Sequence, residues 1–157
     1  MIEKTGDIWT SGADWICITT NGFVKKDGRA VMGRGIALQA TKKMPFVAAL
    51  LGKKIHENGN IVQSIGTSYG DYHTGFSHMV SFPTKNDWHE DSKMELIKKS
   101  CHQLRSMFNE IPPVGQRGMR IAIPRPGCGN GKLIWSNVKP VIEEILVEDN
   151  FEVWSYE

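Results

Sequence analysis

The chain has 157 residues, of which 40% are hydrophobic and 23% are charged, and its formal net charge is +2. This length and balance are typical of one globular domain, and the small net charge neither indicates nor excludes nucleic-acid binding. No apolar stretch approaches the roughly 20 residues of a membrane span, and the first residues lack the apolar core of a signal peptide. We therefore expect a cytoplasmic protein without membrane contact.

Apolar runs with strand character alternate with segments of helical periodicity. In chain order, the expected elements are a strand at 14–20, helices at 35–44 and 45–57, strands at 60–65 and 77–82, a helix at 92–109, a strand at 120–124, a helix at 136–148 and a strand at 151–155. This alternation predicts an α/β fold with a mostly parallel central sheet. One domain is expected to cover residues 1–157.

Two glycine-rich segments follow strand-like runs, one ending at Gly35 and the other spanning Gly127 to Gly131. Glycine has no side chain and tolerates positive φ, so consecutive peptide N–H groups can turn toward an anion. Each segment precedes a helical pattern, whose N-terminus adds partial positive charge. Because such loops meet at the carboxyl edge of an open sheet, a diphosphate could lie between them. The alternative for one loop alone is a structural turn, and neither loop fits a GxGxxG or P-loop motif.

Cysteine and histidine usage argues against metal chemistry. Cys17, Cys101 and Cys128 are odd in number and widely spaced, which fits reduced thiols. Cys128 lies inside the second glycine loop without an identifiable base, so we interpret it as a small loop residue. His73 and His78 have no partner at metal-ligand spacing, so no metal site is expected. No cofactor is expected either.

A set of motifs occurs in an order that resembles the macrodomains, which bind ADP-ribose: Gly6-Asp7-Ile8, Thr20-Asn21, Met32-Gly33-Arg34-Gly35-Ile36-Ala37, Pro83-Thr84-Lys85, Gly127-Cys128-Gly129-Asn130-Gly131 and Trp135. The resemblance implies a three-layer α-β-α domain with a central mixed, mostly parallel sheet. The motifs look most like the branch that holds terminal ADP-ribose glycohydrolases and DNA ADP-ribosyl glycohydrolase antitoxins. ADP-ribose-1″-phosphate phosphatases lie close to that branch.

The resemblance also implies roles for individual residues. Asp7 would accept from the adenine amino group, assisted by the Ile8 amide, although a turn or cap role is the alternative for this aspartate. Asn21 would contact the distal ribose, and Tyr156, like Trp154, is a candidate to cover the adenine. The two loops would bind the diphosphate through Met32, Gly33, Gly35 and Ile36 on one side and Gly127, Cys128, Gly129, Asn130 and Gly131 on the other.

Two departures from the family pattern bear on substrate choice. Residues 22–27 lengthen the first glycine loop, so Lys25 or Lys26 could be recruited to the distal ribose. Gly131 stands where terminal ADP-ribose glycohydrolases carry an aspartate, so a mechanism that needs this carboxylate does not transfer. The DNA-directed branch also has glycine there and depends on a lysine that corresponds to Lys85.

Lys85 is therefore the leading catalytic candidate, with Asn21 beside it at the scissile bond. A lysine at the anomeric carbon can act as a nucleophile on the opened sugar or position water and leaving group. Asp87 and His89 are further candidates for base or acid. The alternatives are a surface lysine at a strand end and a loop of cap and packing residues.

Three functions remain open at this point. The first is a hydrolase that acts at C1″ of the distal ribose and removes ADP-ribose from a modified protein or nucleic acid. The second is an ADP-ribose-1″-phosphate phosphatase, and the third is an ADP-ribose reader without turnover. In each case ADP-ribose is ligand or product, no membrane is involved, and a monomer is expected.

Overall fold

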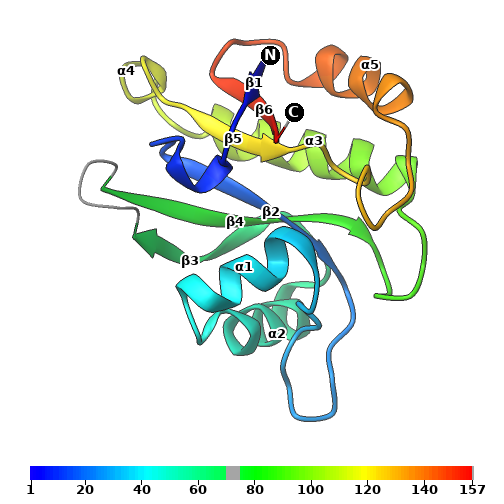
Figure 1. Ribbon diagram of the computed structural model, residues 1–157. Coiled ribbons are helices and arrows are strands. Elements are labelled where there is room, and N and C mark those ends of the chain that lie inside the picture. The colour runs from blue at the N-terminus through cyan, green and yellow to red at the C-terminus, as the bar shows by residue number, and fades with distance from the viewer. Residues whose placement is uncertain (70–74, 157) are drawn as a thin grey trace.

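The computed structural model describes residues 1–69 and 75–156. Its strands form one six-stranded sheet in the order β1-β6-β5-β2-β4-β3 (Figure 1). Their bounds are Ile2–Thr5 (β1), Trp15–Asn21 (β2), Gln63–Tyr69 (β3), Phe76–Lys85 (β4), Ile121–Pro124 (β5) and Phe151–Ser155 (β6). Only the β3–β4 pairing is antiparallel, which confirms the predicted mixed, mostly parallel sheet.

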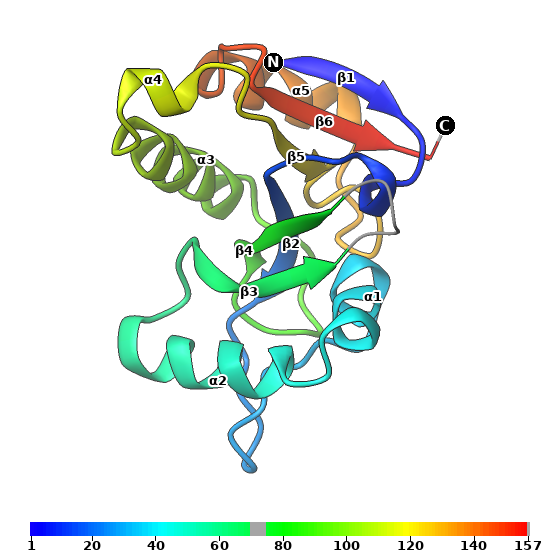
Figure 2. The same cartoon turned by 90° about the vertical axis from the view of Figure 1, so that its left-hand side faces the viewer.

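The helices cover both faces of this sheet. Their bounds are Ile8–Thr10 (the 3₁₀ helix η1), Gly35–Lys43 (α1), Val47–Asn58 (α2), Met94–Asn109 (α3), Pro113–Gln116 (α4) and Trp135–Ile145 (α5). Helices α1 and α2 lie on one side of the sheet and α3 and α5 on the other, so the predicted three layers are confirmed (Figures 1 and 2). Among the described residues, no helix is long and apolar enough to cross a membrane.

Alternate residues of the central strands feed two separate cores. On β2, Cys17 packs in the core beneath α3 and α5, whereas Ile16 and Ile18 pack in the core beneath α1 and α2. On β5, Ile123 and Ala122 divide in the same way. A parallel sheet buried on both faces requires such nearly continuous apolar runs, and these runs are what made the central strands predictable.

The peripheral elements were predicted less well. Strand β1 and helix η1 were not expected, because β1 is an edge strand that exposes Glu3 and Lys4 and shows no apolar run. Strand β3 begins at Gln63 rather than at residue 60, since Asn60 lies in a turn where its Nδ2 donates to the carbonyl of Lys85 at 3.1 Å. The strand then continues past residue 65 through Gly66, which has positive φ and lies beside a register shift. A glycine at this point interrupts the alternation of side chains that predicts a strand.

Candidate functional site

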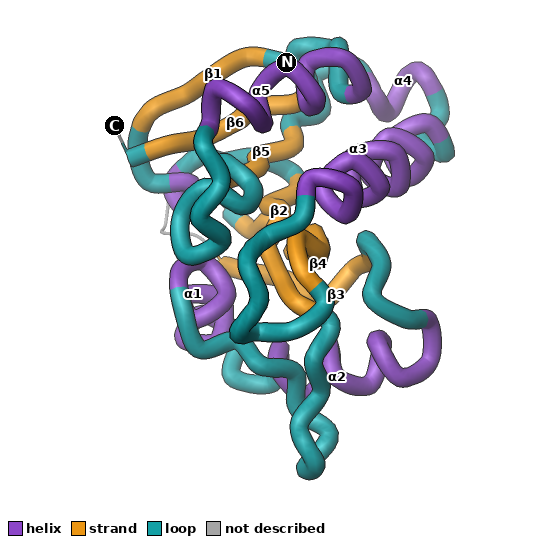
Figure 3. The backbone as a smooth tube through the Cα atoms, turned by 90° about the vertical axis from the view of Figure 1, so that its right-hand side faces the viewer, coloured by secondary structure: helices purple, strands orange, loops and turns teal. Residues whose placement is uncertain are grey.

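The loops after the parallel strands gather at the carboxyl edge of the sheet (Figure 3). Their residues line a cavity of about 630 Å³. This volume is within the usual range for small-molecule sites. Most of the predicted site residues line it: Ile8, Asn21, Met32, Gly33, Gly35, Ile36, Lys85, His89, Gly127, Gly129, Asn130, Gly131 and Tyr156. Asp7, Asp87 and Cys128 are not among the lining residues.

The two glycine loops meet across this cavity. A β-carbon placed on Gly35, in the first loop, would lie 3.9 Å from Nδ2 of Asn130 in the second. The loops are far apart in the sequence, and they approach because the carboxyl ends of β2 and β5 are neighbours in the sheet. The predicted convergence of the two loops at one edge is therefore confirmed.

The positive end of a helix also faces the cavity, and it belongs to α1. Residues 35–37, the first turn of α1, line the cavity, and Arg34 precedes them in extended conformation without a side-chain cap. The first N–H groups of this helix are thus free to bind an anion. None of the residues of α5, all of which are described, lines the cavity. Residues 132–134 separate the second loop from α5, and the expected contribution of the α5 dipole to this loop stays a prediction.

The glycines of the loops divide into two kinds. Gly127 has φ +76°, and a β-carbon there would lie 2.8 Å from Ile97, so packing requires a glycine. Gly131 is equally confined, because a β-carbon on it would lie 2.1 Å from Oγ of Ser92 and 2.6 Å from the carbonyl oxygen of Gly127. Gly33 and Gly129 are exposed, lack positive φ and have nothing within 4 Å of a β-carbon. The fold itself does not need glycine at these two positions, so the open backbone is available to a ligand.

Asn21, the last residue of β2, braces the start of the first loop. Its Oδ1 accepts from the amide of Phe23 at 3.0 Å, and its Nδ2 donates to the carbonyl of Val31 at 3.2 Å. The side chain is buried, and each end of its amide retains one further hydrogen-bonding position. The predicted contact with a ribose stays a prediction, while the bracing of the loop is a role that sequence reasoning missed.

Lys85 ends β4 on the wall of the cavity. Its Nζ donates to the carbonyl of Glu90 at 3.1 Å, which folds the intervening loop back over the strand end. Within that loop, Nδ1 of His89 lies 2.6 Å from Oδ1 of Asp87. Asp87, which does not line the cavity, thus holds one edge of the imidazole of His89, which does line it.

The opposite end of the cavity is aromatic. Trp154 and Tyr156 both line it, in agreement with the expectation that alternation places them on one face. The Tyr156 hydroxyl accepts from Gln39 of α1 at 3.4 Å, and Gln39 in turn accepts from the Trp9 indole at 2.7 Å. Asp7 accepts from the amide of Trp9 at 3.0 Å and caps η1, so the cap role considered as the alternative is present. Its contact with adenine remains untested.

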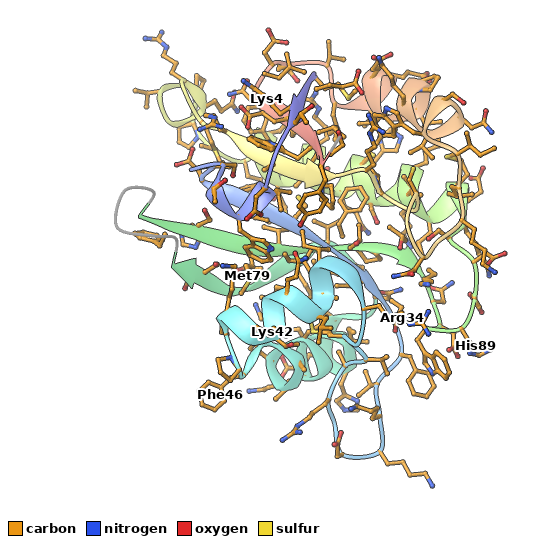
Figure 4. All side chains as sticks on the ribbon, viewed as in Figure 1. Lys4, Arg34, Lys42, Phe46, Met79 and His89 are labelled. Carbon is orange, nitrogen blue, oxygen red and sulfur yellow. The ribbon has the colours of Figure 1, made fainter. Side chains whose placement is uncertain are left out.

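Several lining residues were not singled out from the sequence. Arg34 lies exposed before α1 (Figure 4). Trp88 is exposed between Lys85 and His89 in the chain. Arg125 lies over the ring of Trp135, 5.0 Å from its centroid, and 3.7 Å from the Glu3 carboxylate. The only available signal for Arg125 was its position between a strand and a glycine loop. Trp135, one of the residues of the family motifs, does not line the cavity, but its ring packs against the Arg125 side chain, which does.

The surroundings of the described cysteines and histidines bear on metal and thiol chemistry. Within residues 1–69 and 75–156, no three His, Cys, Asp or Glu side chains are placed to hold a metal ion, and His73 lies outside these residues. Burial raises the pKa of the Cys128 thiol more than nearby Arg125 lowers it. The side chain packs toward the core formed with α3 and α5, which supports its interpretation as a loop residue rather than a nucleophile.

The mixed six-stranded sheet between two helical layers, with glycine loops and a cavity at its carboxyl edge, is the macrodomain fold. A comparison with protein-family models found no match. The macrodomain of Thermus aquaticus DarG superposes with a TM-score of 0.73 at 28% identity, covering 99% of this chain and 97% of that one. Thermosipho africanus DarTG in complex with ADP-ribose superposes with a TM-score of 0.73 at 20% identity, covering 95% and 39%. The fold and the family resemblance predicted from the sequence are thus confirmed.

Curated relatives point to the same branch. The DNA ADP-ribosyl glycohydrolase of Thermus aquaticus is 34% identical over 140 residues, which cover 81% of this chain and 34% of that protein. The enzyme of the same name from Mycobacterium tuberculosis is 28% identical over 109 residues, covering 69% of this chain and 30% of that protein. The chain therefore spans about a third of the length of these relatives.

Proposed function

We propose that this chain is an ADP-ribosyl glycohydrolase that removes ADP-ribose from modified DNA. The observation that carries the proposal is the placement of Lys85 on the wall of the cavity that both glycine loops share. The similarity to enzymes named DNA ADP-ribosyl glycohydrolase supports DNA as the modified macromolecule. The close packing of Gly131 against Ser92 supports this branch over the terminal ADP-ribose glycohydrolases, because an aspartate does not fit at that position.

The cavity offers a separate environment for each part of ADP-ribose. Trp154 and Tyr156 provide an aromatic surface for the adenine. The first turn of α1 and the open backbone at Gly33 and Gly129 provide N–H groups and helix-dipole charge for the diphosphate. The distal ribose then lies toward Asn21 and Lys85, with C1″ closest to the ends of β2 and β4, which pair in the sheet.

The chemistry at C1″ is a hydrolysis. Water oxygen becomes bonded to C1″, the bond from C1″ to the modified base breaks, and the proton lost by water ends on the leaving base. In one route Lys85 attacks C1″ of the opened sugar, the base leaves with a proton, and water then hydrolyses the resulting imine and frees the lysine. In the other route Lys85 only positions water and leaving group. His89 lies in the same loop with its Nδ1 held by Asp87, so its Nε2 is the group that exchanges a proton with water or base.

We also propose that the chain acts as a monomer in the cytoplasm. Its own described segments supply the walls of the cavity, and all three cysteines are free thiols. Free thiols are typical of a reducing compartment.

A substrate panel tests the proposed reaction. A single-stranded oligonucleotide with one ADP-ribosylated base, a glutamate-linked ADP-ribosyl protein and ADP-ribose-1″-phosphate are each incubated with the protein, and released ADP-ribose or phosphate is measured. Turnover of the oligonucleotide alone supports the proposal. Phosphate release alone identifies a phosphatase, and binding of ADP-ribose without any turnover identifies a reader.

The lysine is tested separately. Lys85→Ala is expected to abolish turnover while ADP-ribose still binds in the micromolar range, at about 8 kcal/mol by titration calorimetry. The matched control is Lys98→Ala, since Lys98 is exposed on α3 and does not line the cavity. Reduction with cyanoborohydride during turnover distinguishes the two lysine roles, because only a covalent adduct with the opened sugar is trapped. Full activity of Lys85→Ala contradicts the assignment.

A further inference from the structure

The lengthened first glycine loop forms a hairpin that stands out from the body of the molecule. Residues 22–30 turn back on themselves through a β-bridge between Val24 and Ala30, and the amide of Lys25 donates to the carbonyl of Arg29 at 2.8 Å. Three views show this hairpin projecting away from the sheet, below α1 and α2 in Figure 1 (Figures 1, 2 and 3). The residues that lengthen the first glycine loop therefore form a hydrogen-bonded hairpin.

The hairpin is anchored on α2. The amide of Ala30 donates to the carbonyl of Ala48 at 2.9 Å. Gly28 packs so closely on α2 that a β-carbon on Gly52 would lie 1.9 Å from its carbonyl oxygen. These two contacts fix the direction of the hairpin. The Gly28 carbonyl cannot move along α2 without breaking the hydrogen bond between Ala30 and Ala48.

A depression of about 350 Å³ lies between the hairpin and helices α1 and α2, and its junction with the main cavity is a stretch of wall that the two share. Its walls include Lys25 and Arg29, and it shares Val31, Met32 and Gly33 with the main cavity. Asn21 donates to the carbonyl of Val31, so the junction lies at the Asn21 end of the main cavity. The macromolecule attached at C1″ must leave the cavity at this end.

The hairpin carries unpaired positive charge. Lys25, Lys26 and Arg29 are exposed, and none has a carboxylate oxygen within 4 Å in the described part of the chain. The one acid in the hairpin, Asp27, has an oxygen that accepts from the amide of Arg29 at 3.0 Å. Arg34 adds another exposed cation at the junction with the main cavity, on the same side of the molecule as His89 (Figure 4).

We propose that the phosphates of the nucleic-acid strand that carries the ADP-ribose lie along this hairpin, on Lys25, Lys26 and Arg29. The proposal rests on the proposed function, because it takes nucleic acid as the modified macromolecule. The hairpin depression adjoins the Asn21 end of the main cavity, and cations without carboxylate partners match the regularly spaced negative charge of a nucleic-acid strand. The hairpin then gives the protein affinity for the strand around the modified base, in addition to the ADP-ribose.

The test compares two substrates with one charge variant. The variant Lys25→Gln, Lys26→Gln, Arg29→Gln is expected to lose roughly tenfold or more in kcat/KM on an ADP-ribosylated single-stranded 10-mer at low salt, but to keep its activity on the ADP-ribosylated mononucleotide. The slope of log kcat/KM against log salt is expected to shrink by roughly 0.7 for each phosphate that the variant no longer neutralises. The control is Lys98→Gln, Lys99→Gln, Arg117→Gln, which removes the same charge from exposed positions outside both cavities. Equal losses on both substrates, or no loss, overturn the proposal.

A binding measurement keeps this result separate from the proposed reaction. Fluorescence anisotropy with an unmodified single-stranded 10-mer is expected to show salt-dependent binding by the wild type and by the control variant, and at least tenfold weaker binding by the hairpin variant. This result supports the hairpin surface even if no conjugate is hydrolysed, in which case only the proposed function fails. Indistinguishable binding by the wild type and the hairpin variant overturns the surface. Stronger binding to a polyglutamate peptide than to the oligonucleotide also overturns it.

Discussion

Ser92 leaves no room for a side chain on Gly131. A β-carbon on Gly131 would lie 2.1 Å from Oγ of Ser92, and the amide of Ser92 donates to the Gly131 carbonyl at 3.1 Å. This contact joins the loop after β4 to the loop after β5, on the wall of the cavity. The missing carboxylate at position 131 is therefore a consequence of how the two loops pack.

Gly131→Ala is accordingly expected to destabilise the fold by about 1–3 kcal/mol through overpacking. Thermal unfolding of Gly131→Ala, Ser92→Gly and the double variant measures the coupling. The double variant should recover part of the loss, because the Gly127 carbonyl at 2.6 Å remains. Unchanged stability in Gly131→Ala would show that the loops separate easily and that an aspartate could be accommodated.

Gly33 and Gly129 should behave in the opposite way. Alanine has free space at both positions, so stability is expected to stay within about 0.5 kcal/mol of the wild type. The added methyl groups would stand where the ligand approaches the backbone, so ADP-ribose affinity should fall at least tenfold in Gly33→Ala and in Gly129→Ala. Calorimetric titration measures this loss, and unchanged affinity would place the diphosphate elsewhere.

Gly52→Ala tests the anchoring of the hairpin. Helix propensity alone favours alanine by about 1 kcal/mol, but the overlap with the Gly28 carbonyl at 1.9 Å is severe and involves backbone. We expect the overlap to dominate, with a net destabilisation of about 1–3 kcal/mol in urea unfolding. Ala49→Gly, at an exposed position of the same helix, is the control for propensity alone. A stabilised Gly52→Ala would mean that the hairpin is not seated on α2.

The cysteines should be inert in the folded protein. Burial raises the pKa of Cys128, raises that of Cys101 to about 12 and raises that of Cys17 further. Alkylation by iodoacetamide at pH 8, followed by mass spectrometry, should label all three only after unfolding in urea. Cys128→Ser should retain turnover, and rapid labelling of native Cys128 with loss of activity would make this thiol a catalytic candidate.

Glu3 makes the support of Arg125 sensitive to acid. Hydrogen bonds from Lys139 at 2.8 Å and Trp135 at 2.9 Å lower the pKa of Glu3 below its ordinary value of 4.5. A lowered pKa in the folded state stabilises the fold above pH 4.5, and this contribution disappears as the pH falls through the folded-state value.

The stabilisation should therefore be visible as a difference between two melting curves. The melting temperature of the wild type is expected to exceed that of Glu3→Gln at pH 7, and the gap should close as the pH falls below 4.5. Scanning fluorimetry in matched buffers measures it. Because Glu3 is partly exposed, the gap should also narrow in high salt. A gap that does not shrink as the pH falls below 4.5 would assign the effect to something other than the ionised carboxylate.

Local patterns were sufficient for the fold class and for most of the cavity wall. The apolar runs of β2, β4 and β5 predicted a mostly parallel sheet, because strands buried on both faces must be apolar throughout. The order of the glycine loops and of Lys85 along the chain placed them at one edge, since the carboxyl ends of parallel strands share that edge. These inferences need only residue types and spacing.

Contacts between distant segments decided the rest. Whether a glycine serves packing or a ligand depends on what lies opposite, and for Gly131 that is Ser92 from another loop. Arg125 is held by Glu3 from β1, and the hairpin is held by Gly52 from α2. Periodicity does not encode such pairings, because each partner looks ordinary in its own segment. Only the folded chain brings the partners within contact distance, and there it determines which residues face the cavity.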